Sequence, residues 1–278
     1  MSLLGRLFGS KPQTPMRDIA SLVAPYAAPA LHVTLGDSPS RSHVGGEPNL
    51  PEGRNWPTRN GIRLNFLARF SLAEVHAAGT INWLPPTGAL LFFYDMERQP
   101  WGYDPADKGS WAVLLVDDLK VPASAADPLP INSPKIPFRF AQFRSIQSLP
   151  SPERKSMEAL SLNDAEFDEL MRLTDEVFAS KPKHQIGGFP APVQEDEMEL
   201  ESQLVSHGLH CGDQTGYKDS RAVALGPGAA DWRLLLQFDS DDDLGVMWGD
   251  AGTLYFWVTE VSAREGKFED AWLVQQCC

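Results

Sequence analysis

Apolar residues along this chain gather in short runs of strand length, separated by turns rich in glycine and proline. The runs lie at residues 31–35, 62–70, 89–94, 111–116, 234–238, 253–259 and 271–274, and Phe138 and Phe140 alternate about Arg139. Runs of four to eight apolar residues between turn residues are typical of strands. The pattern therefore predicts a protein that is mainly β.

Helical spacing is found in fewer places. Residues 163–179 keep their apolar side chains on one face, and Asn163 and Glu166 have the spacing of a capping box at the start. Residues 15–27 show the same periodicity after Thr14, with a proline at the first helical position. The fold class that we expect is therefore α+β, predominantly β, with a few short helices.

Two further segments have helical features. Ser71 and Glu74 are spaced as a second capping box, which predicts a short helix over residues 72–78. The acidic run at residues 195–201 is interpreted either as the solvated face of a helix or as a disordered segment.

The two halves of the chain share a series of landmarks. The first half has GGEP at 45–48, then FLARF before Ser71, then Gly88 before ALLFFYD; the second has GGFP at 187–190, LLLQF before Asp239, and Gly252 before TLYFWVT. A recurring order of landmarks predicts an internal duplication, in which two related β-rich halves pack together. A chance likeness between apolar strands is the alternative.

This repeat sets the expected domain organisation. We predict an N-terminal tail over residues 1–14 and a single domain over 15–278, whose related halves span about 31–120 and 181–278. A Pro-rich and then helical insert joins them at about 121–180. The glycine pairs are interpreted as tight turns packed against the sheet, with an anion-binding nest of backbone N–H groups as the alternative.

The charge and the cysteine content of the chain indicate which partners and which cellular location to expect. The 24 basic and 37 acidic residues give a net charge of −13, which repels a phosphate backbone and argues against nucleic acid. The charge suits solubility or a basic protein partner. No stretch approaches the ~18 apolar residues of a membrane-spanning helix, and the three cysteines form no disulfide framework. We therefore expect a cytoplasmic protein without a membrane partner.

One acidic loop has the spacing of calcium ligands. Asp239, Asp241, Asp243 and Asp250 fall at positions 1, 3, 5 and 12 of a calcium loop. Leu244, however, stands where the sharp turn requires glycine, and Asp250 stands where a longer, bidentate glutamate is usual. Calcium binding is therefore a hypothesis, and capping of a short helix by Asp239 and Asp242 is the plainer interpretation.

Transition-metal binding and catalysis have less support in the sequence. His207, His210 and Cys211 bring three soft donors close together, but polar loop residues explain them as well. The sequence has no nucleophile elbow, phosphate-binding loop, dinucleotide fingerprint or HExxH motif, so we assign no catalytic residue, no metal and no cofactor. Four tryptophans beside turns are candidates to line a groove or to pin loops to the core: Trp56, Trp83, Trp101 and Trp248.

Taken together, the run from Gly45 to Pro57 and the segments NFLARFSLAE, GALLFFYD, IGGFP, LLLQFDSDDD and MWGDAGTLYFWV resemble the YwqG-like family of bacterial proteins, a domain of unknown function. The resemblance covers residues 15–278. It implies a mixed, β-rich fold with internal duplication, and it implies no reaction, cofactor or catalytic residue. Arg69 departs from the glutamine often found there in the family, which Gln237 retains in the second half.

These observations favour a non-enzymatic binding module that captures a basic protein or an unidentified small ligand through a face lined by loops. The alternative is an enzyme with a small-molecule pocket at the junction of the two halves.

Overall fold

A large sheet of ten strands dominates the computed structural model, which describes residues 17–118, 135–178 and 181–278. Its strands are β1 (Ala28–Gly36), β2 (His43–Val44), β5 (Asn65–Ser71), β6 (Ala89–Tyr94), β7 (Trp111–Val116), β8 (Arg139–Ser148), β9 (Gln185–Ile186), β10 (Trp232–Asp239), β11 (Thr253–Thr259) and β12 (Trp272–Gln276). A separate small sheet pairs β3 (Thr58–Arg59) with β4 (Ile62–Arg63).

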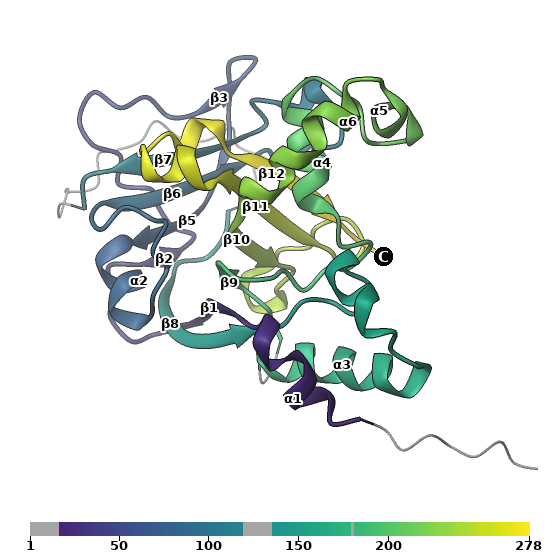
Figure 1. Cartoon of the computed structure of the whole chain (residues 1–278). Coiled ribbons are helices and arrows are strands. Elements are labelled where there is room, and N and C mark those ends of the chain that lie inside the picture. The colour runs from purple at the N-terminus through teal and green to yellow at the C-terminus, as the bar shows by residue number, and fades with distance from the viewer. Residues whose placement is uncertain (1–16, 119–134, 179–180) are drawn as a thin grey trace, which may run out of the picture.

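Short helices surround this sheet (Figure 1). The α-helices are α1 (Ile19–Val23), α2 (Leu72–Ala78), α3 (Asp164–Glu176), α4 (Met198–Ser206), α5 (Gln214–Lys218), α6 (Ala222–Leu225) and α7 (Glu260–Arg264). The 3₁₀ helices are η1 (Ala24–Tyr26), η2 (Pro105–Asp107), η3 (Lys155–Leu160), η4 (Gly226–Asp231), η5 (Asp242–Leu244) and η6 (Phe268–Asp270). The predicted class, a β-rich fold with several short helices, is confirmed. Within the described ranges, no helix combines the length and apolarity needed to cross a bilayer.

The order of strands in the large sheet is similar when it is followed inward from either edge: three longer strands, then a two-residue strand, then a central strand. It runs β12-β11-β10-β9-β1-β8-β2-β5-β6-β7, so β1 pairs with β9 of the second half and β8 pairs with β2 of the first. A bulge interrupts β5 between Phe66 and Ala68 and β10 between Leu234 and Leu236. This correspondence is what a duplication predicts, and the duplication itself stays a prediction.

Strand β8 lies within residues 121–180, the segment interpreted from the sequence as an insert. In the structure it pairs with β1 from Ala28↔Ser148 to Gly36↔Phe140, at the centre of the sheet. The predicted tail at 1–14, the start of the first helix at Thr14 and most of the Pro-rich crossing lie outside the described residues. The described part of the first helix begins after Asp18, whose side chain accepts from the Ser21 N–H.

The sheet curls, so that its two flanks face each other across the main core. The first flank consists of β5, β6 and β7, and the second of β10, β11 and β12. Phe92 of β6 meets Phe256 of β11 edge to face with ring centroids 5.3 Å apart. Trp111 of β7 meets Trp272 of β12 at 4.9 Å and donates from Nε1 to the Ala271 carbonyl. Each such aromatic pair adds about 0.5–1.5 kcal/mol beyond its buried area, so these contacts hold the flanks together.

Both glycine pairs adopt left-handed backbone conformations at the ends of the two short inner strands. Gly45 and Gly46 have φ of 63° and 71°, and Gly187 and Gly188 have 70° and 68°. A Cβ on Gly45 would lie 2.4 Å from the carbonyl oxygens of Ile136 and Pro137. The N–H groups of Gly45, Gly46 and Gly187 donate to backbone carbonyls. The tight-turn interpretation therefore holds, and these three N–H groups are not free to form an anion nest.

The two predicted capping boxes have different outcomes. Asn163 and Glu166 form the full box at the start of α3. Ser71 forms no side-chain cap of α2; its hydroxyl donates instead to Asp118. Glu74 accepts from the Ser42 hydroxyl at 2.6 Å, so the box predicted for α2 is wrong because both side chains have partners elsewhere.

In each half, the side chain three residues before the glycine pair accepts a hydrogen bond from the backbone N–H at the end of a long strand, but the two side chains differ. Ser42 accepts from the Ser71 N–H and donates to Glu74. In the second half, His184 Nδ1 accepts from the Asp239 N–H at 3.0 Å and its Nε2 lies 3.3 Å from Asp241. His184 is thus held as the tautomer that carries its proton on Nε2.

The acidic run at 195–201 begins as irregular chain at 195–197 and continues as helix α4, and it is not a fully solvated face because Asp196 and Glu201 are buried. Glu201 on α4 is only 8% exposed. Tyr217 donates to its Oε1 at 3.0 Å, and Oε2 has no hydrogen-bond partner among the described residues. Burial raises the pKa of Glu201 to about 7, against the lowering effect of the Tyr217 hydrogen bond.

Replacing Gly45 by Ala tests the close backbone approach. We expect Gly45→Ala to lower the free energy of unfolding by on the order of 3 kcal/mol, since left-handed strain adds to a clash with two carbonyls. Gly61→Ala is the control, because Gly61 has φ 78° and a Cβ added to it would have no neighbour within 4 Å; strain alone costs about 1–2 kcal/mol there. Urea unfolding measures both, and equal losses would contradict the packing argument.

Glu201→Gln tests the buried carboxyl. Because the folded-state pKa of Glu201 lies above its ordinary value of 4.5, the stability of the native protein falls as pH rises from about 4.5 through 7, and glutamine removes this loss. The stability of the variant relative to the native protein should rise between pH 5 and pH 8 by on the order of 2–3 kcal/mol. The exposed Glu158→Gln controls for removal of one charge. A pH-independent difference would refute the assignment.

Candidate functional site

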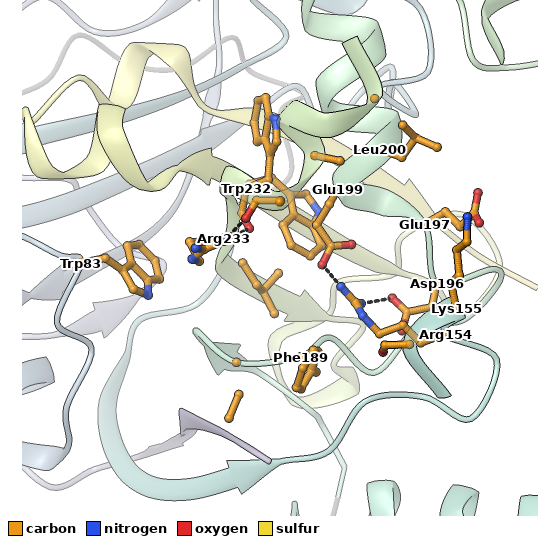
Figure 2. Close-up of a pocket in the computed structure, with 18 of the residues that line it drawn as sticks. Trp83, Arg154, Lys155, Phe189, Asp196, Glu197, Glu199, Leu200, Trp232 and Arg233 are labelled. Atoms are coloured by element: carbon orange, nitrogen blue, oxygen red, sulfur yellow. Dashed lines mark hydrogen bonds and ion pairs between the residues drawn. The ribbon is translucent and has the colours of Figure 1, made fainter. Parts of the chain in front are cut away.

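The candidate site is a cavity of about 740 Å³ beside helix α4. Its walls come from segments far apart in the chain, as Figure 2 shows. The start of β1, the turn after β9, the start of α4, helix η4 and strands β10 and β11 all contribute, together with Trp83 and residues 154–156. The site thus joins elements of the first half, the intervening segment and the second half.

Aromatic side chains form the apolar part of the cavity. Trp83, Trp232 and Trp257 line it and are 7%, 4% and 1% exposed, so they form its floor and not its rim. Trp232 is fixed by a hydrogen bond from its Nε1 to Gln203 on α4 at 2.8 Å. Phe189 lines the wall, and the guanidinium of Arg154 lies 4.9 Å from its ring centroid.

An ion cluster closes one end of the cavity. Arg154 donates from Nη1 to Asp196 Oδ1 at 2.8 Å and from Nη2 to Glu199. Figure 2 shows this group opposite Trp83 and Arg233. Burial raises the pKa of Asp196 to about 6, even though Arg154 lowers it. Arg154 itself is kept charged, since its two carboxylate partners raise its pKa against the effect of burial.

Two buried polar atoms of lining residues have no hydrogen-bond partner within the part of the chain that the structure describes. They are Oδ2 of Asp196 and Nε1 of Trp257. Asp196 and Trp257 are 6% and 1% exposed, and a buried group left unsatisfied costs about 1–3 kcal/mol. Because the Asp196 side chain has no exposed area, its unsatisfied oxygen lies behind the wall of the cavity and not on its surface.

The calcium candidates lie elsewhere and serve the backbone. Asp239 accepts from the Lys183 N–H and the Thr253 hydroxyl. Asp241, and not the predicted Asp239, caps η5 by accepting from the N–H groups of Asp243 and Leu244. Asp250 is exposed. Among the described residues no cluster of three or more His, Cys, Asp or Glu side chains is arranged to hold a metal ion.

The soft-donor cluster is also dispersed. His207 contacts the Gln203 carbonyl through Nδ1 at 2.7 Å, whereas His210 lies 3.7 Å from Asp104. Cys211 is buried and its thiol points to the Leu209 carbonyl. Each side chain therefore has a local partner, as expected of loop residues.

Of the four tryptophans proposed to line a groove, Trp83 lines this cavity. Trp56 packs on β6, Trp248 is fully buried against Tyr94, and Trp101 is 43% exposed. Sequence reasoning missed the residues that matter most here: Trp232, Trp257, Phe189, Arg154 and Asp196. The proximity of Phe189 to the second glycine pair was a usable signal, and Asp196 within an acidic run beside buried Met198 was another.

The family of this chain emerges from its sequence. No curated protein matches it. The family described as domain of unknown function (DUF1963) matches residues 42–277, which include both glycine pairs and every strand from β2 to β12. The chain therefore belongs to the DUF1963 family of unknown function.

Proposed function

We propose that this protein is a binding module that takes a small ligand, or a side chain of a partner, into the cavity beside α4. The observation that carries the proposal is a cavity of about 740 Å³ whose wall combines tryptophan rings with the ion cluster of Arg154. Ligand sites are mostly apolar cavities of about 300–1,000 Å³ with a few placed polar groups, and this cavity fits that description.

The ion cluster supports binding in a defined orientation. Arg154 holds Asp196 through Nη1 and Glu199 through Nη2. Trp232 is fixed to α4 through Gln203, so the floor and the polar end belong to one rigid surface. A site that is formed in advance loses little entropy when its ligand binds.

An enzyme is the second candidate, and the raised pKa of Asp196 favours it. A carboxyl with a pKa of about 6 directly behind the wall of a cavity is suited to change its protonation state near neutral pH. The YwqG-like resemblance adds no reaction to this. Turnover of a bound compound, detected by mass spectrometry of the incubated mixture and lost in Asp196→Asn, would favour the enzyme over the binding module.

The partner and location predicted from composition stay part of the proposal. A net charge of −13 favours a basic partner. Such a partner would present a side chain to the cavity, and the cytoplasm is the location that suits its three free cysteines.

Screening of small molecules by thermal unfolding tests the proposal. A ligand at a hundredfold excess over its Kd should stabilise the native protein by about 2.7 kcal/mol and raise Tm by several degrees. Ala230→Trp should abolish this rise, because Ala230 is exposed on the rim and an indole there fills the cavity.

Val223→Trp is the matched control, since Val223 is 86% exposed on α6 and does not line the cavity. Its ligand response should equal that of the native protein. Failure of every compound, or equal responses from both tryptophan variants, would refute binding at this cavity.

A further inference from the structure

The accessible wall of the cavity is apolar between two charged ends. Side chains that are half-buried or exposed form it, so a bound group can touch them: Pro29, Phe189, Leu200, Ala229 and Ala230. At one end, Arg233 donates to Glu260 at 2.9 Å and to the carbonyls of Ala230 and Trp232, so its charge is already matched. A charged group of a ligand is therefore expected at the other end.

That other end, which holds the ion cluster of Arg154, is acidic. Residues 153–155 and 195–199 meet there through the bonds from Arg154 to Asp196 and Glu199. The two segments carry five carboxylates against two cations, a net charge of −3 when all are ionised. The exposed members are Glu153, Lys155, Glu195 and Glu197. Charge complementarity favours a cationic group of a ligand at this end.

An apolar surface continues from the cavity onto helix α6. Residues 222–230 contain no polar side chain, and none of them is buried. Val223 is 86% exposed, and it lies on the same side of α6 as Gly226, three residues later, which lines the cavity. A small molecule within the cavity would leave this surface in water. Contiguous exposed apolar surface is characteristic of sites that bind another protein.

We propose that this face docks a segment of a partner protein, which places an apolar side chain in the cavity, covers Val223 and lays lysine or arginine side chains on the acidic end. The inference rests on the proposed binding function and names its ligand as a polypeptide segment that is both apolar and basic. The net charge of −13 attracts such a partner from a distance, and an apolar anchor in a cavity then fixes its orientation.

Calorimetric titration with three hexapeptide amides tests the chemistry of the partner. Between terminal glycines, the first has leucine and phenylalanine followed by two lysines. The second replaces the lysines by glutamates, and the third replaces the apolar pair by serines. At low ionic strength the first should bind about tenfold more tightly than either of the others, and its advantage over the glutamate peptide should shrink as salt is added. Equal binding of the first and third peptides would indicate adsorption by charge alone and overturn the proposal.

Two charge variants with opposite expected effects locate the basic side chains. Glu197→Gln should weaken binding of the lysine peptide about threefold, whereas Lys155→Gln should strengthen it by a similar factor. Both side chains are exposed, and Glu197 provides no side-chain cap for α4, so we expect both variants to fold. Unchanged affinity in both, or a change in the same direction, would contradict docking on the acidic end.

Val223→Ser tests the surface outside the cavity. We expect it to weaken binding of the lysine peptide about threefold. Small compounds from the thermal screen should bind this variant as they bind the native protein, because Val223 does not line the cavity. Unchanged peptide binding would overturn the proposal. A native protein that dimerises in analytical ultracentrifugation and becomes monomeric on Val223→Ser would also overturn it, since the occupant would then be a second copy of the chain.

Ala230→Trp separates this inference from the proposed function. It should abolish binding of the lysine peptide, because the added indole fills the cavity. If no peptide binds while small compounds bind in a manner blocked by Ala230→Trp, the partner class is overturned and the binding function stands. Absence of any binding that Ala230→Trp blocks overturns both.

Discussion

Close approach of backbone at the two glycine pairs is the constraint on which the sheet depends. Each pair ends a two-residue strand that lies between a central strand and an outer flank: Gly45 beneath the carbonyls of Ile136 and Pro137, Gly188 against Ser148 and Ala30. A side chain at either place would push the central strand away from its neighbour. The same sheet brings Phe92 of one flank to Phe256 of the other, and Gly188 also lines the cavity beside α4.

The strands and the fold class were predictable because a buried strand needs a run of apolar residues whatever its partners. Strand β8 shows the limit of this reasoning. Its exposed Arg139, Gln142 and Arg144 are interspersed with apolar residues, so its pattern indicates a strand but not a place at the centre of the sheet. The caps show a second limit. Ser71 and Glu74 have the right spacing, yet Asp118 and Ser42 compete for them from distant parts of the chain. Most of the candidate site could not be predicted from the sequence, because Arg154, Asp196 and Trp257 come together only in the folded chain.

The two flanks share a backbone plan and differ in what covers them. Ser42 with Glu74, and His184 with Asp241, support the same backbone position with different chemistry. Trp56 packs on Phe93 in the first flank, whereas Asp196, Glu197 and Glu199 line the cavity beside the second. The binding site proposed above thus lies beside one flank only.

The pairing of strands at the centre of the sheet affects how the chain folds while it is being synthesised. β1 pairs with β8, and the nearest of their paired residues, Gly36 and Phe140, are separated by more than a hundred positions. A ribosome therefore releases β1, β2 and the whole first flank before the neighbours that complete the sheet exist. Non-local pairing of this kind is slow, and the nascent first half must keep an open sheet edge from aggregating until β8 and β9 emerge. Acidic charge spread over the chain is one property that would protect that interval.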